Sequence, residues 1–224
     1  MNDSLPRFWL RLLTFRATQD DYASLGPRHA LAGLAACWVV GMGRYWDDPR
    51  ASLLQHLGAG SVVYVFVLSA LLWCVVKPLE PLLFSYARVL AFITMTAPPA
   101  ILYAVPVEKW MTLQEANHMN LRFLLLVAAW RVALWVHNLR VWGRFSPGTL
   151  VVAATMPLAV IFWALTSLNL QHVVVNIMGG IREADKSSQD AAWSWLFTMT
   201  LLSVPVSVAS ALAWLLILAR DRNN

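Results

Sequence analysis

Residues 192–218 read AWSWLFTMTLLSVPVSVASALAWLLIL, a run without Asp, Glu, Lys or Arg. A helix needs about 20 mostly apolar residues to cross the hydrocarbon core of a bilayer, and this run is long enough. The chain of 224 residues is 59% hydrophobic and 13% charged, whereas a soluble domain is about 45–50% apolar and about 25% charged. The composition therefore excludes a soluble globular domain, and it also excludes disorder, which needs low hydrophobicity and high net charge.

Working outward from this run, five more apolar segments meet the same requirement. We predict an all-α fold, a polytopic transmembrane helix bundle whose six spans cover roughly 28–46, 56–76, 82–104, 121–141, 149–170 and 192–218. The uncharged core of the first span runs only from Ala30 to Gly43, so a re-entrant first segment, leaving five spans, is the alternative. Three parts follow: an amphipathic N-terminal segment (1–25), a transmembrane helical domain (26–220) and a short polar tail (221–224).

Helix-start signals support several of these boundaries. Gly26-Pro27 and Ser146-Pro147 each place proline at the first helical position behind a capping residue. The run from Thr112 to Glu115 fits a capping box, which would begin the fourth span's helix before it enters the membrane.

The N-terminal segment has the pattern of a short amphipathic helix. Phe8, Leu12 and Phe15 recur at helical spacing with arginines between them. The segment lacks the uninterrupted apolar region and small-residue cleavage site of a signal peptide. It is interpreted as an interfacial helix lying on anionic lipid, with packing against the bundle or a partner as the alternative.

The distribution of basic residues predicts that both termini are cytoplasmic, because cytoplasmic loops are enriched in Lys and Arg. With six spans, ten basic residues fall on the cytoplasmic side and six on the far side, out of 17 in the chain. The cytoplasmic set is Arg7, Arg11, Arg16, Arg28, Lys77, Arg88, Arg140, Arg144, Arg220 and Arg222, and the far-side set is Arg44, Arg50, Lys109, Arg122, Arg182 and Lys186. Because these residues are spread thinly, they form no basic face for nucleic acid.

The remaining basic residue, Arg131, lies at the centre of the fourth span and is the first candidate for a binding site. Insertion scales place an arginine there at about +2.5 to +3.5 kcal/mol, so we expect it to face the bundle interior or a wet cavity. Trp135 lies one turn on, where it could stack on the guanidinium, and Asn138 continues the stripe. No Asp or Glu lies at matching depth, which leaves backbone carbonyls, lipid phosphate or an anionic ligand as partners. A purely structural arginine is the alternative.

Prolines within the spans are predicted helix breaks. Pro98 and Pro99 remove two backbone donors from the third span and free the carbonyls near Thr94 and Met95. Pro157 and Pro205 are predicted to interrupt the fifth and sixth spans. Broken helices that face a buried arginine resemble the layout of transporter sites, although neighbouring groups often satisfy the freed carbonyls in membrane helices.

Two further polar or small-residue faces are candidates for a pathway or for packing. Asn169 and His172 form a polar stripe at the far end of the fifth helix, which could line a vestibule or a helix-packing seam. Ser203, Ser207 and Ala211 give the last span a small-residue face suited to close packing within or between protomers.

The sequence shows no catalytic motif. His56, His118 and several carboxylates lie in far-side loops, but their spacing matches no hydrolase or metal signature. Cys37 and Cys74 lie inside apolar runs and are interpreted as small buried hydrophobes. We therefore expect no metal, no cofactor and a non-enzymatic protein. The catalytic alternative is an integral-membrane enzyme, which would need His56, His118 and the far-side acids to converge on one cavity.

Residues 41–50, GMGRYWDDPR, followed by Leu54 to Gly58 and by 97–103, APPAILY, resemble a group of uncharacterised bacterial inner-membrane proteins. The hydropathy layout is similar to that of the Yip1-like membrane proteins, although those usually have five spans. The resemblance covers most of the chain and brings no catalytic motif. It implies a bacterial inner (plasma) membrane location.

The sequence therefore predicts a small, non-enzymatic, multi-pass inner-membrane protein. Its expected activity is to bind or move a lipid or small anion through a polar interior around Arg131, as a homo-oligomer in contact with membrane lipids. The alternative is a membrane scaffold, an assembly factor or an immunity-type interaction protein, which would engage a protein partner through its far-side loops and N-terminal helix.

Overall fold

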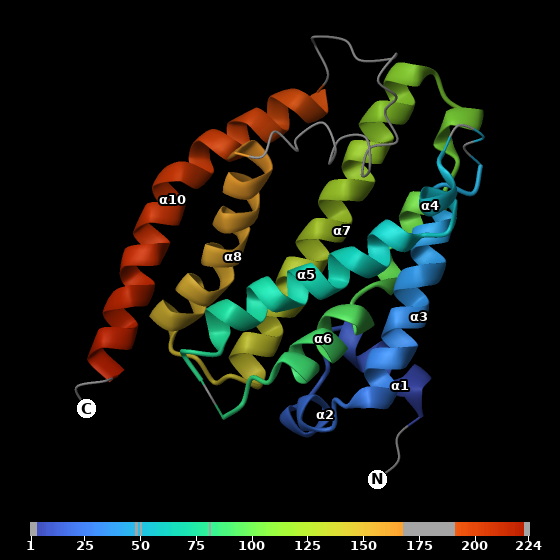
Figure 1. Cartoon of the computed structure of the whole chain (residues 1–224). Coiled ribbons are helices and arrows are strands. Elements are labelled where there is room, and N and C mark those ends of the chain that lie inside the picture. The colour runs from blue at the N-terminus through green and yellow to red at the C-terminus, as the bar shows by residue number, and fades with distance from the viewer. Residues whose placement is uncertain (1–3, 48, 50, 81, 168–190, 222–224) are drawn as a thin grey trace. The chain divides into compact units, whose positions relative to one another are not determined.

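The computed structural model describes residues 4–47, 49, 51–80, 82–167 and 191–221. Within these residues the secondary structure is helical, with no strand. In chain order (Figure 1) the helices are α1 (Leu5–Leu13), α2 (Gln19–Ala23), α3 (Pro27–Gly43), α4 (Leu53–His56), α5 (Ala59–Val76), α6 (Tyr86–Met95), the 3₁₀ helices η1 (Pro98–Ala104) and η2 (Val107–Lys109), α7 (Leu113–Val141), α8 (Pro147–Ser167) and α10 (Ala191–Asp221).

Four described helical segments are long and apolar enough to cross a membrane: Ala59–Val76, His118–Val141, Pro147–Ala164 and Thr198–Arg220. Tyr86–Met95 and Pro98–Lys109 together make a fifth, bent by 46° at the Pro98-Pro99 break. These segments match five of the six predicted spans. The all-helical class is therefore confirmed for the described residues, and the apolar helices are compatible with a multi-pass membrane protein.

The first predicted span forms a shorter helix than the others. Helix α3 has 17 residues, which at 1.5 Å per residue extend about 25 Å, less than the roughly 30 Å of a hydrocarbon core. It begins as predicted, with Gly26 as the N-cap and Pro27 at the first position. The total of four or five suitable helices therefore does not establish the predicted six.

Other predicted boundaries are also confirmed. The Thr112 backbone N–H donates to Glu115 Oε2 at 3.0 Å, and the Glu115 N–H donates back to Thr112 Oγ1 at 3.4 Å, so a capping box begins α7. Ser146 Oγ accepts from the Thr149 N–H at 3.4 Å where α8 begins. In both cases a local pairing supplies acceptors for N–H groups that the first turn of a helix leaves free.

The chain divides into two compact units. The first, called unit 1, comprises Met1–Val105 and Ala129–Leu150, and the second, called unit 2, comprises Pro106–Ala128 and Val151–Asn224. The predicted single helical domain over 26–220 stays a prediction, and its polar tail beyond residue 221 lies outside the described residues.

Close packing between α3, α5 and α6 forms the centre of unit 1 (Figure 1). The buried residues of α3 are His29, Gly33, Cys37 and Gly41, which recur every four residues along one face. A Cβ at Gly33 would lie 2.5 Å from Thr94 Oγ1 of α6, and a Cβ at Gly41 would lie 2.7 Å from Ser61 Oγ of α5. Glycines thus permit contacts that larger side chains would prevent.

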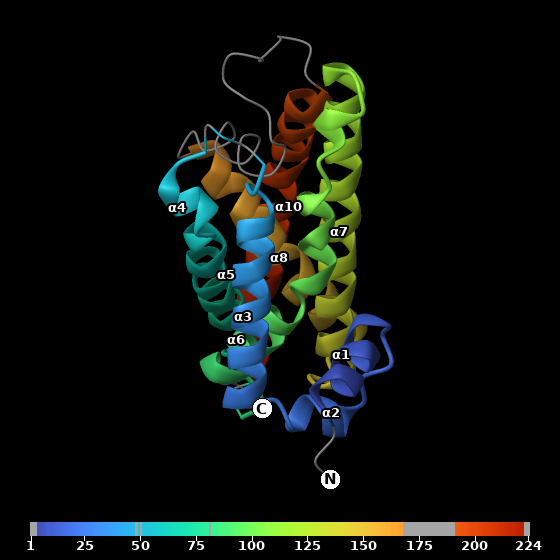
Figure 2. The ribbon, with the colours of Figure 1, turned by 90° about the vertical axis from the view of Figure 1, so that its right-hand side faces the viewer.

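The N-terminal helices pack onto the rest of unit 1 (Figure 2). Phe8 and Leu12 of α1 are fully buried, as is Tyr22 of α2. The indole nitrogen of Trp130 in α7 donates to the Leu13 carbonyl at 3.0 Å. The apolar face of α1 is therefore covered by the chain itself, as the packing alternative predicts. The spacing predicts that Phe15 shares this face. Phe15 instead lies beyond the end of α1 with a φ of 60°, and its side chain is exposed.

The proline predictions have different outcomes at different positions. Helix α6 ends at Met95, three residues before Pro98, and the 3₁₀ helix η1 begins at Pro98. Helices α8 and α10, by contrast, remain helical through Pro157 and Pro205, so the predicted interruptions there do not occur. A single proline removes one helical hydrogen bond, whereas two adjacent prolines remove two successive ones.

In unit 2, the small-residue face of α10 packs inside the protein. Ser203 and Ser210 are buried, and Ser210 Oγ is hydrogen-bonded to Thr155 Oγ1 of α8 at 3.0 Å. Of the predicted face, Ser207 and Ala211 are half-buried. This face therefore supports packing within the protomer.

The two cysteines differ in exposure. Cys37 is buried as predicted, but Cys74 is exposed on the outer surface of α5, so its predicted burial is wrong. An apolar run predicts a lipid-compatible environment without specifying whether a side chain faces protein or lipid.

Candidate anion-binding site

Helix α7 directs one face of its C-terminal half into unit 1. Arg131 is half-buried, and Trp135 and Asn138, which follow it along the helix, are 5% and 3% exposed. The stripe identified in the sequence therefore lies on the interior side of unit 1.

The guanidinium of Arg131 has one anchored end and one unpaired end. Its Nε donates to Thr96 Oγ1 at 3.3 Å, and that hydroxyl in turn donates to the Ile93 carbonyl at 2.7 Å. Its Nη2 is buried and has no hydrogen-bond partner in the described part of the chain. Burying an unpaired neutral donor costs about 1–3 kcal/mol of free energy, and burying an unpaired charged donor costs more. This nitrogen is therefore the strongest indication of a missing acceptor.

The carbonyls freed by the proline pair accept from other donors. Met95 O, which lacks an N–H partner at Pro99, accepts from the indole nitrogen of Trp9 at 2.8 Å. Thr94 O accepts from the Cys37 thiol at 3.6 Å and from the Ala97 N–H at 3.2 Å. The proline break was predicted to free these carbonyls, and the hydrogen bond shown for Arg131 uses the Thr96 side chain instead.

A second arginine, Arg44, lies in the same unit and was not among the predicted site residues. It caps the C-terminus of α3, and its Cζ lies 4.5 Å from the ring centroid of Tyr103 in η1. Its Nη2 is also buried without a partner among the described residues. The basic-residue pattern places Arg44 on the far side, and the structure shows it at the end of α3 against Tyr103.

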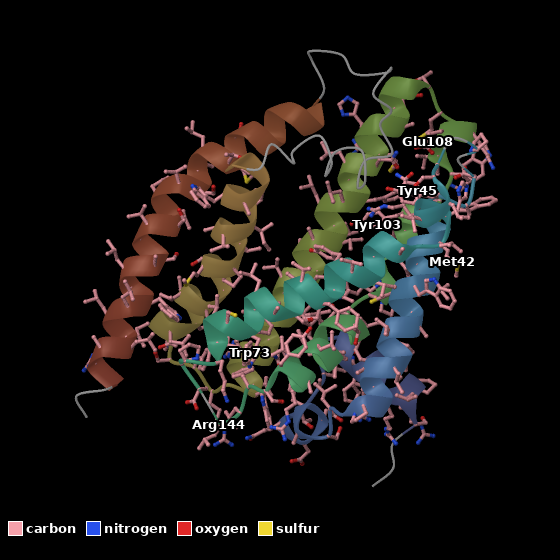
Figure 3. All side chains as sticks on the ribbon, in the orientation of Figure 1. Met42, Tyr45, Trp73, Tyr103, Glu108 and Arg144 are labelled. Carbon is pink, nitrogen blue, oxygen red and sulfur yellow. The ribbon has the colours of Figure 1, made fainter. Side chains whose placement is uncertain are left out.

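Aromatic side chains lie beside Arg44. Arg44 lies over the ring of Tyr103. Figure 3 shows the side chains of Tyr45 and Tyr103 near the end of α3 marked by Met42. Hydroxyls and arginine N–H groups are both hydrogen-bond donors, so this part of unit 1 is rich in donors.

Carboxylates do not balance these charges in the part of the chain that the structure describes. The ion pair shown there joins Arg11 to Asp21, between α1 and α2. Arg44 and Arg131 each hold a buried, unpaired guanidinium nitrogen in unit 1, and a buried positive charge of this kind favours an anion.

The other predicted site residues have different surroundings. The Trp135 ring packs 5.9 Å from Phe92 and 6.5 Å from Phe84, measured between ring centroids. Asn138 lines a small open hollow together with Tyr22, Arg88 and Trp142, and Arg131 does not line it. Arg131 and Asn138 thus lie on the same face of α7 but have different surroundings.

Several sequence candidates cannot be placed in a common site. Asn169 and His172 lie outside the described residues. His56 is half-buried in unit 1, with Nδ1 3.2 Å from the Ser52 carbonyl, and His118 is exposed in unit 2. The catalytic alternative required these histidines to converge with acids, and neither one shows a carboxylate contact in the described structure.

No protein-family model, curated protein or solved structure matches this chain. The similarity to Yip1-like proteins therefore stays a prediction.

Proposed function

We propose that this protein is a non-enzymatic inner-membrane component that binds or moves a phosphate-bearing lipid or a small anion, with Arg131 as the residue that contacts the anion. Its apolar helices are compatible with a membrane protein. The observation that carries the proposal is the buried, unpaired Nη2 of Arg131. An oxyanion would supply the missing acceptor, since arginine binds phosphate through parallel N–H···O bonds.

The proposal includes the finer topology predicted from the sequence. Six spans, with α3 as the first, place ten basic residues on the cytoplasmic side and six on the other. A 17-residue helix can span by local thinning of the bilayer at modest cost. Arg7 and Leu10 on the outer surface of α1 are exposed, which suits a helix that covers the bundle on one side and contacts headgroups on the other.

Native mass spectrometry of the protein released from mild detergent tests this function. The wild type should retain a phospholipid or a small anion, and Arg131→Gln should lose it while keeping its helix content. Arg140→Gln is the matched control, because Arg140 lies on the same helix but is exposed. Equal retention by the wild type and Arg131→Gln would make Arg131 a structural residue and contradict the proposal.

The same spectra report the number of subunits. A homo-oligomer is part of the proposal because a bundle of this size gains an enclosed pathway by assembly. A ligand-free monomer, unchanged by Arg131→Gln, would instead favour the interaction-protein alternative. Charge reversals in the loops would then be the next variants to make.

A further inference from the structure

We infer that the hollow lined by Arg88 and Asn138 binds the phosphodiester group of an anionic phospholipid, as a second site apart from Arg131. The hollow lies within unit 1, at the first turn of α6 and the end of α7. Arg131 does not line it. The inference therefore goes beyond the proposed function, and either one can fail without the other.

The side-chain amide of Asn138 is a polar group in this hollow without a described partner. Asn138 is 3% exposed and lines the hollow, and no hydrogen bond of its amide is shown in the described part of the chain. Its backbone carbonyl, by contrast, accepts from the N–H groups of Trp142 and Gly143. Burying an amide without a hydrogen bond is unfavourable, so a ligand oxygen that accepts from its NH₂ group would be bound favourably.

Arg88 supplies a positive charge to the same hollow. Its Nη1 donates to the Leu83 carbonyl at 3.3 Å, and its Cζ lies 5.3 Å from the ring centroid of Trp142. These contacts hold the guanidinium without neutralising its charge, and among the residues that the structure describes no ion pair of Arg88 with a carboxylate is shown. A guanidinium has several N–H donors, so others remain for an oxyanion.

The position of the hollow along the helices indicates a lipid headgroup. The apolar segment of α7 that is long enough to cross a membrane ends at Val141, between Asn138 and Trp142. Arg88 lies in the first turn of α6. The ends of spanning helices lie at the level of the headgroups, where arginine side chains extend toward phosphates and tryptophan is enriched. The phosphates of the surrounding lipids are therefore the oxyanions found at this depth.

Size and charge favour the phosphodiester of an anionic lipid. The hollow is small and open, so it can take a phosphate oxygen while the rest of the lipid stays outside. Phe84 and Phe92 contribute to its walls, and hydrogen bonds are stronger in such apolar surroundings. The phosphate of phosphatidylglycerol carries the single negative charge that balances Arg88. Phosphatidylcholine adds a trimethylammonium group that Arg88 repels.

Titration of the full-length protein with phosphatidylglycerol in an uncharged detergent tests the site, with bound lipid counted by native mass spectrometry. The wild type should bind phosphatidylglycerol about tenfold more tightly than phosphatidylcholine. Asn138→Leu removes the amide without changing the charge and should weaken phosphatidylglycerol binding about tenfold. Arg88→Gln should weaken it about 10- to 100-fold. Arg140→Gln is the matched control, because Arg140 is exposed on the same helix and does not line the hollow.

Asn138→Leu separates a defined site from general attraction of lipid to basic residues. Wild-type binding by Asn138→Leu, or equal losses in Arg88→Gln and Arg140→Gln, would overturn the inference. Thermal unfolding without lipid reports whether Asn138→Leu folds, and we expect an unchanged or higher midpoint because the amide gives up no described hydrogen bond. Should this variant not fold, a larger loss of binding in Arg88→Gln than in Arg140→Gln supports the inference by itself.

The inference and the proposed function fail in different ways. Arg131→Gln should keep the phosphatidylglycerol bound at the hollow, because Arg131 does not line it. If Asn138→Leu loses no lipid but Arg131→Gln does, the hollow is not a lipid site and the proposed function stands. If Asn138→Leu loses lipid and Arg131→Gln loses none, the hollow is supported and the proposed function fails.

Discussion

The indole nitrogen of Trp9 donates to the carbonyl of Met95, 86 positions along the chain, at 2.8 Å. Met95 ends α6, and the proline at position 99 has no N–H with which to satisfy that carbonyl. The N-terminal helix therefore supplies the donor that the broken helix lacks. This bond links the amphipathic segment to the residues that precede Thr96, the anchor of Arg131.

Replacing Trp9 by phenylalanine keeps an aromatic ring but removes this donor. We expect Trp9→Phe to lower the free energy of unfolding by about 1–3 kcal/mol, the cost of an unsatisfied buried carbonyl. Thermal unfolding in detergent measures the change. Trp163→Phe is the control, because Trp163 is 58% exposed on α8, and an equal loss in both variants would contradict the assigned role of the bond.

The contact between Gly33 and α6 predicts a sharp steric limit. A Cβ at this position would lie 2.6 Å from the Thr94 carbonyl carbon and 2.7 Å from the Met95 nitrogen, and backbone atoms cannot move aside cheaply. Gly33→Ala should therefore destabilise the protein by about 1–3 kcal/mol. Gly60→Ala should be neutral or slightly stabilising, since nothing lies within 4 Å of its Cβ. Unfolding midpoints of the two variants, compared with the wild type, decide the matter.

Composition and local patterns predicted most of the helices. The apolar runs identified five of the membrane-compatible segments, and the capping signals at Gly26, Thr112 and Ser146 marked helix starts correctly. These features are local, because a cap or an apolar run acts on residues next to it in the chain. The number of spans depends instead on how a bilayer accommodates a 17-residue α3, which local patterns do not determine.

The candidate site was predicted in part. Arg131 could be singled out because an arginine within an apolar run is conspicuous. Arg44 could not, because a basic residue just beyond a short span looks like an ordinary loop charge. Its contact with Tyr103 depends on the packing of α3 against η1. The four-residue spacing of Gly33, Cys37 and Gly41 was a visible signal for that packing, and it points to the face of α3 that lies against its neighbours.

The ion pair between Arg11 and Asp21 predicts a pH dependence in the N-terminal segment. Burial raises the pKa of Asp21, but hydrogen bonds from Arg11 and Thr18 outweigh it and leave the pKa below its ordinary value. A carboxyl group whose pKa is lower in the folded state than in the unfolded state stabilises the folded state when the pH is above the unfolded pKa of about 3.9. This contribution is lost as the pH falls through the folded-state pKa. Stability should therefore decrease on acidification below about pH 4.

Asp21→Asn tests this dependence. At pH 7 we expect a loss on the order of 1 kcal/mol, and the difference from the wild type should shrink as the pH falls below about 4. Asp20→Asn is the matched control, because Asp20 is adjacent and exposed. Unfolding midpoints at several pH values provide the comparison, and a difference between the wild type and Asp21→Asn that grows toward acid would contradict the assignment.

The Thr96 hydroxyl offers the most direct test of how Arg131 is held. Thr96 is 1% exposed, accepts from Arg131 Nε and donates to the Ile93 carbonyl. Thr96→Val should therefore lower the free energy of unfolding by about 1–3 kcal/mol and weaken anion binding. Thr96→Ser should keep both hydrogen bonds. Thr94→Val is the control, because the hydrogen bonds that the structure shows for the Thr94 hydroxyl go to Leu90 and Ala91 of its own helix. A double-mutant cycle with Arg131→Gln then isolates the pair. We expect a coupling of about 0.5–3 kcal/mol for Thr96 with Arg131 and a coupling near zero for Thr94. Equal couplings would mean that Arg131 is positioned by general packing, and the orientation of its Nη2 would then need another explanation.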